Sequence, residues 1–217
     1  MIVAIDGPAG AGKSTVARAL AERLHFRYLD TGAMYRALTW LAMHRGIDLG
    51  DAVALAELAA SEPVVFDDEG RVWIAGTDVT SSIRDQRIDR MVPVVARHAS
   101  VREVMRERQR ELGAEGDVVI EGRDIGTVVA PDAPVKVYLT ASDAVRAERR
   151  SADLATDPAV TVALTQAEQQ RRDQADAAQM AKAPDAVLID SSALGLDEVI
   201  SVIESLARER ADAAWSR

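Results

Sequence analysis

The strongest constraint on this chain is a run of small residues near the N-terminus that ends in a lysine. Residues 7–15 read GPAGAGKST and directly follow MIVAID. From Gly7 to Ser14 they match G-x-x-x-x-G-K-[ST], in which glycines with positive φ let the backbone approach a ligand closely. Successive backbone N–H groups then point into one concavity, which suits phosphate oxygens. The sequence therefore predicts a phosphate-binding loop.

The residues around this loop supply the context that the motif requires. Residues 2–5 form an apolar run typical of a strand buried on both faces. Val16, Leu20 and Leu24 repeat every four residues, which predicts a helix over 13–24 whose N-terminal dipole favours an anion. Lys13 would reach the outer phosphates of a nucleotide, and the Ser14 hydroxyl would hold Mg²⁺. The predicted phosphate-binding loop comprises Gly7, Pro8, Ala9, Gly10, Ala11, Gly12, Lys13, Ser14 and Thr15.

Alternating apolar runs and helical patterns predict the rest of the fold. We expect strands over 27–30, 117–121, 135–139 and 186–190, and helices over 33–45 and 197–213. Such alternation indicates an α/β fold with a parallel sheet. Residues 63–80 break this rhythm, because they favour two strands around a DDEG turn. We interpret them as a small inserted hairpin over the ligand edge of the sheet, the alternative being a peripheral decoration.

Composition limits the class of protein. The 217 residues, 48% of them hydrophobic, suit one domain with an insert. The chain has no cysteine, which is compatible with a reducing cytosol. It shows neither a signal peptide nor an apolar run long enough to cross a membrane. We expect a cytoplasmic protein without a membrane partner. We also expect a monomer.

The charge of the chain is unevenly distributed. The net charge is −9, which disfavours general binding of nucleic acid, so we expect no nucleic-acid partner. Residues 84–110 hold eight arginines against four acidic residues, a local net charge of +4. A basic segment in an acidic protein suits a small anionic ligand. The alternative is a solvated helix face, formed by arginines that recur every four residues at Arg102, Arg106 and Arg110. We expect one or two of the eight arginines to bind a ligand.

The absence of one residue type excludes several classes of nucleotide-binding protein. The chain contains no asparagine. This excludes the guanine-reading N-K-x-D of switch GTPases and the H-R-D-x-x-x-x-N loop of protein kinases. A small kinase acting on a small acceptor remains.

Arg36, Arg123 and Asp124 follow predicted strands and could face one crevice with Lys13, because ligands bind at the carboxyl ends of strands in open α/β sheets. The alternative for each is an exposed loop ion pair.

Several segments together resemble the bacterial cytidylate kinases. They are GPAGAGKST, LDTGAMYR, VREVMRERQR, EGRDIGTVVAPDAPVKVYL, RAERR and AVLIDSS, and the resemblance runs from residue 2 to about residue 203. It implies a P-loop nucleoside monophosphate kinase fold with a five-stranded parallel sheet flanked by helices. A single kinase domain would span residues 1–217. Within it, residues 61–83 would form a β-containing insert that binds the nucleoside monophosphate, and residues 146–158 a short lid.

The same resemblance implies a reaction and a set of site residues. ATP would phosphorylate CMP or dCMP to CDP or dCDP with Mg²⁺, and Lys13, Arg123 and Arg149 would be catalytic. The residues implied to bind the acceptor are Thr31, Tyr35, Arg36 and Arg123 at the phosphate, Arg102 and Asp124 at the cytosine, and Arg172 and Asp176 at the ribose. The lid residues implied to contact ATP are Arg146, Arg149 and Arg150.

Two positions depart from the family pattern. Pro93 stands where a serine is common near the base, and Gln179 stands where an arginine is common. These departures leave fine substrate preference open. Two other readings also remain: a P-loop kinase of another nucleoside monophosphate or small acceptor, such as shikimate or a sugar acid, and a binding module that holds ATP without chemistry.

Overall fold

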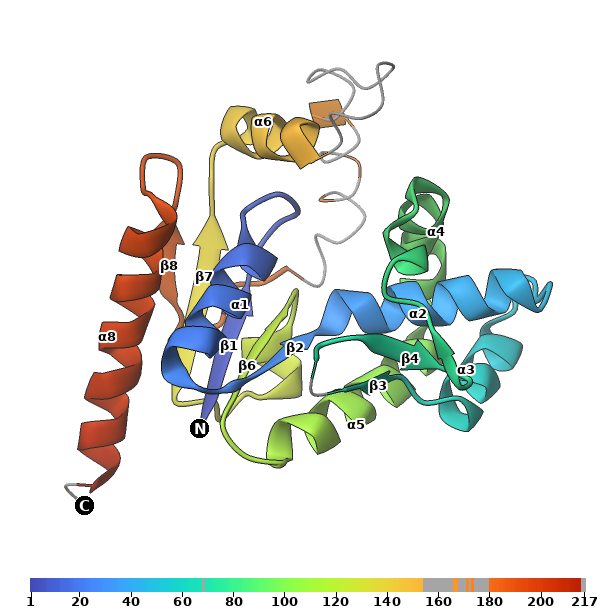
Figure 1. Cartoon of the computed structure of the whole chain (residues 1–217), viewed down its shortest axis with the longest axis horizontal. Coiled ribbons are helices and arrows are strands. Elements are labelled where there is room, and N and C mark those ends of the chain that lie inside the picture. The colour runs from blue at the N-terminus through green and yellow to red at the C-terminus, as the bar shows by residue number, and fades with distance from the viewer. Residues whose placement is uncertain (68, 154–165, 168–170, 172, 174–179, 216–217) are drawn as a thin grey trace. The chain divides into compact units, whose positions relative to one another are not determined.

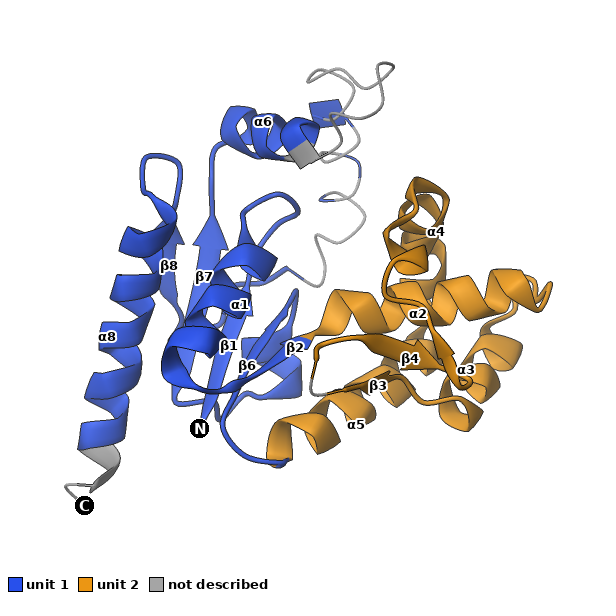
Figure 2. Ribbon diagram, in the orientation of Figure 1, with its two compact units in different colours: residues 1–29, 115–217 blue, residues 30–114 orange. Residues whose placement is uncertain are grey.

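The computed structural model of this protein describes residues 1–67, 69–153, 166–167, 171, 173 and 180–215 (Figure 1). By its internal contacts the chain divides into two compact units (Figure 2). Unit 1 comprises residues 1–29 and 115–217, and unit 2 comprises residues 30–114. None of the helices in the described ranges combines the length and the apolar content that crossing a membrane requires.

A five-stranded sheet forms the centre of unit 1. Its strands are β2 (Arg27–Asp30), β6 (Val118–Gly122), β1 (Ile2–Asp6), β7 (Val135–Thr140) and β8 (Val187–Asp190), in that spatial order. β1 lies in the middle and pairs in parallel with β6 and β7, while β7 pairs in parallel with β8. The five-stranded parallel α/β sheet predicted from the sequence is therefore confirmed. Because β1 is central, the loop that follows it emerges at the middle of the carboxyl edge.

Two helices pack on one face of this sheet. They are α1 (Lys13–Leu24) and α8 (Leu196–Trp215), which contact each other (Figure 1). Leu20 of α1 and Ile203 of α8 are fully buried against Val137 and Leu139 of β7. This apolar packing fixes the position of α1 and therefore of its first residue, Lys13.

Unit 2 is built mainly from helices. These are α2 (Thr31–His44), α3 (Ala52–Ser61), α4 (Gln86–Ala96) and α5 (Ala99–Ala114). Its apolar interior includes Met34 and Leu38 of α2 and Leu55 of α3, all fully buried. α2 also contacts a single turn of 3₁₀ helix, η1 (Ser82–Arg84).

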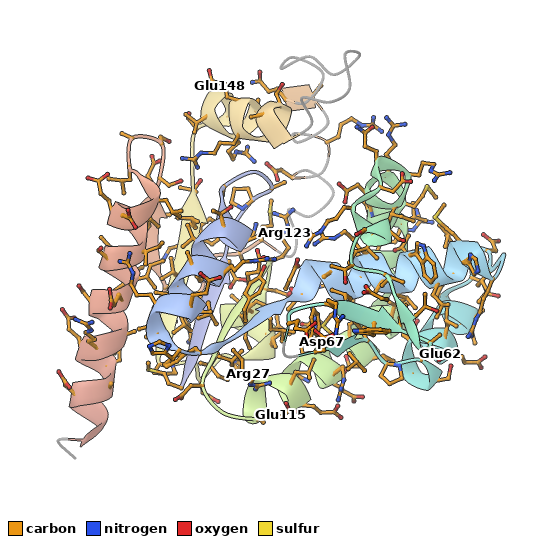
Figure 3. The ribbon with its side chains drawn as sticks, in the orientation of Figure 1. Arg27, Glu62, Asp67, Glu115, Arg123 and Glu148 are labelled. Carbon is orange, nitrogen blue, oxygen red and sulfur yellow. The ribbon has the colours of Figure 1, made fainter. Side chains whose placement is uncertain are left out.

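A small antiparallel sheet in unit 2 occupies the segment predicted as a hairpin. It has three short strands rather than two: β3 (Val65–Phe66), β4 (Val72–Ile74) and β5 (Thr77–Asp78). The Asp67 carboxylate, labelled in Figure 3, closes the turn by accepting hydrogen bonds from the backbone N–H of Arg71 at 2.9 Å and from the Trp73 indole at 2.9 Å. The compact unit around this sheet extends over residues 30–114, beyond the 61–83 insert expected from the sequence. A role of that insert in nucleotide binding stays a prediction.

The predicted lid begins within a helix of unit 1. Residues 146–153 belong to α6 (Asp143–Asp153), which follows β7. Residues 154–158 lie outside the described residues. A short π-helical segment, η2 (Ile125–Val129), follows β6 and contacts both β1 and β6.

Candidate active site

The loop between β1 and α1 has the backbone that the motif predicts. Gly7, Gly10 and Gly12 have φ values of 149°, 75° and 89°, in the region that favours glycine. A Cβ at Gly7 would lie 2.0 Å from the carbonyl oxygen of Leu139. Position 7 therefore has no room for a side chain, because β7 passes directly beside it.

A buried carboxylate fixes the entrance to this loop. Asp6, the last residue of β1, accepts hydrogen bonds from the backbone N–H groups of Ile125 and Gly126, each at 2.8 Å. Burial raises the pKa of Asp6, while these two N–H donors act in the opposite direction by stabilising the carboxylate. Asp6 was not among the predicted site residues. Its place at the carboxyl end of a buried strand, the rule that singled out Arg123, could have identified it.

Lys13 is the first residue of α1 and bonds back to its own loop. Its Nζ donates to the carbonyl of Pro8 at 2.8 Å. Burial, followed by the nearby positive charge of Arg123, lowers the pKa of Lys13 from 10.5 to about 7. The free protein thus holds this ammonium in surroundings that disfavour its charge, and an anion in the loop would reverse that effect.

We expect ATP binding to be accompanied by proton uptake at pH 8. With a pKa of about 7, most Lys13 side chains are neutral at that pH, whereas the terminal phosphate of ATP is already ionised. The bound phosphates favour the charged ammonium and raise the pKa of Lys13. Calorimetry in buffers of different ionisation enthalpy should show uptake approaching one proton at pH 8 and declining as the pH is lowered through 7.

The Lys13→Arg variant is the control for this proton uptake. A guanidinium stays charged throughout this pH range, so ATP should bind to the variant without proton uptake. Equal uptake by both proteins, or none by the wild type at pH 8, would contradict the lowered pKa of Lys13.

Three arginines of unit 1 bond to alternate carbonyl groups of the loop. Arg123 Nη1 donates to Gly7 at 2.7 Å, Arg146 Nη1 to Ala9 at 2.9 Å and Arg149 Nη1 to Ala11 at 3.4 Å. Figure 3 labels Arg123, which follows β6. All three of these arginines were predicted from the sequence. Together with Lys13 they gather four cationic side chains around one loop, which is the charge that a polyphosphate requires.

Asp173 and Ser191 hold two of these arginines and were not predicted. Asp173 accepts from Arg146 Nη1 at 2.5 Å and from the backbone N–H of Ala9 at 3.4 Å. Arg149 donates to Ser191 Oγ at 3.0 Å and to the Ser191 carbonyl at 2.9 Å. Ser191 follows β8 at the carboxyl edge of the sheet, so the strand-end rule could have found it. For Asp173 the sequence offers no comparable signal.

Unit 2 carries the predicted acceptor residues of α2. The Asp30 carboxylate caps this helix by accepting the Ala33 backbone N–H at 2.8 Å, and it also accepts from Arg36 Nη2 at 2.9 Å. Thr31 is buried and Tyr35 is half-buried in the first turns of the same helix. Arg36 is thereby fixed one turn inside the helix, as the sequence predicts.

The chain matches the family described as cytidylate kinase over residues 3–209. The chain belongs to the cytidylate kinase family. A cytidylate kinase of Rhodococcus jostii is 45% identical to it and covers 98% of this chain and 97% of its own length. A cytidylate kinase of Geobacillus is 44% identical, with 96% of each chain covered.

Other relatives are larger proteins. A bifunctional pantoate ligase/cytidylate kinase of a Synechococcus strain is 47% identical over 96% of this chain, but the match covers only 41% of the relative. The chain thus spans about two fifths of the length of such bifunctional relatives of the cytidylate kinase family.

Solved structures of other kinases share the fold. A gluconokinase of Sinorhizobium meliloti has a TM-score of 0.53 at 16% identity and covers 99% of this chain and 96% of its own. A shikimate kinase of Bacteroides thetaiotaomicron has a TM-score of 0.51 at 14% identity, covering 96% and 98%. At these identities the likeness concerns the fold alone.

The two residues that the family resemblance places at the base are both buried. Arg102 lies in α5 of unit 2 and Asp124 follows β6 in unit 1, each 8% exposed. Arg102 therefore does not belong to a solvated helix face, whereas Arg110 on the same helix is exposed. Pro93, where the family often has a serine, lies inside α4.

Some of the predicted positions are not described by the structure. Arg172, Asp176 and Gln179 lie outside the described residues. Arg150 belongs to α6, but its side chain is likewise not described. The roles of these residues stay predictions.

Ser14 offers a ligand for a metal ion in the first turn of α1. It is exposed and directly follows Lys13, and its hydroxyl oxygen is a hard donor of the kind that Mg²⁺ prefers. Over the described part of the chain, no three histidine or carboxylate side chains form a group that could hold a metal. This donor set fits an ion bound by one hydroxyl, phosphate oxygens and water, as is usual for Mg²⁺ in kinases.

Proposed function

We propose that this protein catalyses ATP-dependent phosphorylation of CMP and dCMP to CDP and dCDP. The observation that carries the proposal is the match to the cytidylate kinase family over nearly the whole chain, including a full-length relative named cytidylate kinase. The phosphate loop, with Lys13 at its edge and three arginines on its carbonyl groups, supplies the chemistry that such a transfer needs.

Charge neutralisation is the main task of the residues around the loop. Phosphoryl transfer depends on positioning and electrostatic stabilisation more than on covalent chemistry. The loop N–H groups and Lys13 would hold the phosphates of ATP. Arg146 and Arg149 would exchange their loop carbonyl partners for phosphate oxygens. Mg²⁺ held by Ser14 would add a further positive charge on the phosphates.

The acceptor contacts in this proposal follow the family resemblance. Arg36 and Arg123 would bind the phosphate of CMP, with Thr31 and Tyr35 beside it. A second set of contacts would read the nucleoside, with cytosine bound by Arg102 and Asp124, and ribose by Arg172 and Asp176. A closing lid over residues 146–158 would keep water away from the transferred group, so that CMP rather than water accepts it.

A panel of acceptors tests this proposal. With ATP and Mg²⁺, ADP release should be fastest with CMP and dCMP, and much slower with UMP, AMP, shikimate and gluconate. Shikimate and gluconate are included because kinases of these acceptors share the fold. Faster turnover of another acceptor would replace CMP in the proposal. ATP binding without turnover of any acceptor would indicate a binding module.

We expect Arg123→Met to weaken use of the acceptor more than use of ATP. If Arg123 holds the CMP phosphate, its loss should raise KM for CMP roughly 10- to 100-fold, since charge-assisted hydrogen bonds are among the strongest. Arg123→Lys should rescue poorly, because an ammonium cannot replace a bidentate fork. Steady-state kinetics with each substrate varied in turn measures the split.

The main alternative for Arg123 concerns the loop itself. Its 2.7 Å hydrogen bond to the Gly7 carbonyl could serve to shape the ATP site. In that case KM for ATP and KM for CMP would rise together.

The monomeric state and the cytoplasmic location expected from the sequence stay predictions.

A further inference from the structure

A single carboxylate in unit 2 is shared by two arginines. Asp30 Oδ2 accepts a hydrogen bond from Arg36 Nη2 at 2.9 Å and a longer one from Arg84 Nη2 at 3.4 Å. Its other oxygen, Oδ1, accepts the Ala33 backbone N–H at 2.8 Å. Both oxygens of Asp30 are therefore engaged, and two guanidinium groups converge at the N-terminus of α2.

This cluster has more positive than negative charge. One carboxylate faces two guanidiniums, and the side chains of Asp30 and Arg36 are only 6% and 16% exposed. Water screens the buried Asp30–Arg36 pair only weakly, and the half-exposed guanidinium of Arg84 adds a second positive charge that an anion can reach. Arg36 Nε is buried and has no hydrogen-bond partner among the described residues. A buried donor without a partner is costly, and an anion bound here would satisfy it.

Gly32 leaves the surface of this cluster open. A Cβ at position 32 would lie 3.1 Å from Asp30 Oδ1 and 3.3 Å from Arg36 Nη1. Any larger side chain would crowd the ion pair. The positive end of the α2 dipole lies beside the same groups, because the helix begins at Thr31. A phosphate monoester, which carries nearly two negative charges at neutral pH, has the charge that suits this position.

The backbone around Arg84 is fixed independently of Asp30. Arg84 ends η1, where the preceding Ile83 is fully buried. The next residue, Asp85, caps α4 by accepting the Arg87 backbone N–H at 2.8 Å. The Arg84 side chain is nonetheless 50% exposed, so its guanidinium is the part of the cluster most accessible to a ligand.

We propose that Arg84 is a second cation at the acceptor phosphate, paired with Arg36 through Asp30. Arg84 would bind the phosphate of the acceptor nucleotide directly. Asp30 would be a positioning residue that holds the two guanidiniums together. This inference rests on the proposed function and adds a contact to those that the family resemblance assigns to the acceptor.

Arg87 provides a matched control for Arg84. It lies three residues further along the chain, is 81% exposed and forms its own ion pair with Asp85 at 2.7 Å. We expect Arg84→Met to raise KM for CMP roughly 10- to 100-fold and to leave KM for ATP within about twofold, while Arg87→Met changes neither. Arg84→Lys should recover only part of the loss.

A comparison of CMP with cytidine separates binding from structure. Cytidine lacks the phosphate, so Arg84→Met should weaken CMP binding and leave competitive inhibition by cytidine unchanged. The inference is overturned if Arg84→Met behaves like Arg87→Met. It is also overturned if CMP and cytidine weaken by the same factor and the melting temperature falls, because Arg84 would then be structural.

Calorimetric titration with CMP alone, without ATP, keeps this test independent of catalysis. A wild-type protein that binds CMP without turning it over contradicts the proposed function, and the comparison of the two variants still decides the role of Arg84. A wild-type protein that does not bind CMP overturns both proposals.

Discussion

The Lys13→Met protein should lose at least about 10³-fold in kcat, which corresponds to roughly 4 kcal/mol of transition-state stabilisation. The same protein should melt at a higher temperature than the wild type. The loss of activity follows because no other lysine lies in the phosphate loop, and a planar guanidinium cannot replace its compact ammonium. The gain in stability follows from the surroundings of Lys13 in the free protein, where burial lowers its pKa from 10.5 to about 7.

The sign of the stability effect can be worked out from the two pKa values. Between pH 7 and 10.5 the unfolded chain binds a proton at Lys13 that the folded chain releases. The cost of keeping this lysine in the fold is therefore full below pH 7 and disappears as the pH rises through 10.5. An apolar side chain removes that cost, on the order of 1–3 kcal/mol after partial solvent screening, or about 2–4 °C in Tm for each kcal/mol.

Lys136→Met is the matched control for this experiment. Lys136 is buried, and its Nζ pairs with Asp185 at 2.7 Å and bonds the Pro131 carbonyl. Its removal should lower the melting temperature and leave kcat unchanged. Thermal melting and steady-state kinetics measure both effects. Near-normal kcat in a folded Lys13→Met protein would contradict the assignment of Lys13.

The Asp124→Asn protein should lose most of its preference for CMP over UMP. A carboxylate accepts a hydrogen bond from the N4 amino group of cytosine, whereas uracil presents an acceptor there. A guanidinium at Arg102 would meet the opposite mismatch at N3. Two mismatched buried groups at about 1–3 kcal/mol each predict a CMP preference of roughly 10²- to 10⁴-fold in the wild type. An amide can donate as well as accept, so the ratio of kcat/KM should collapse, mainly through loss on CMP.

Asp132→Asn makes the same chemical change on the protein surface. Asp132 is exposed, while Asp124 is 8% exposed. The surface variant should keep the full preference for CMP. An unchanged CMP/UMP ratio in Asp124→Asn, together with a lower melting temperature, would show that Asp124 is structural and that the base is recognised elsewhere.

The three central strands of the unit 1 sheet were predictable from the sequence because they are buried on both faces. Such strands leave continuous apolar runs, and β1 and β7 are found within one residue of their predicted bounds. The helix at the phosphate loop was predicted over the residues that form α1, because the glycines before it and the four-residue spacing of its apolar side chains mark both ends.

The strands of unit 2 were harder to predict. The three strands of the small sheet have only two or three residues each, too few for a period of two to show. The Asp67 side chain stabilises this sheet through contacts that composition cannot reveal. The sequence therefore indicated two strands where three are present.

The sequence indicated Arg123 through its place after a strand, and Arg146 and Arg149 through the family resemblance, and the roles of these residues stay predictions. Arg123, Arg146 and Arg149 all contact the phosphate loop. Arg84 and Asp173 could not be selected from the sequence, because their partners Asp30 and Arg146 are distant along the chain. In an arginine-rich segment, spacing alone does not show which guanidinium reaches a buried carboxylate.

The most direct test of the proposed function follows the phosphoryl group itself. ATP labelled at the γ-phosphate is incubated with the protein, Mg²⁺ and CMP, and the products are separated. The account predicts that the label appears at the β-phosphate of CDP, in an amount equal to the ADP formed, and that the Lys13→Met protein produces almost none. Label found only in inorganic phosphate, or unchanged ATP under conditions where CMP is bound, would contradict it.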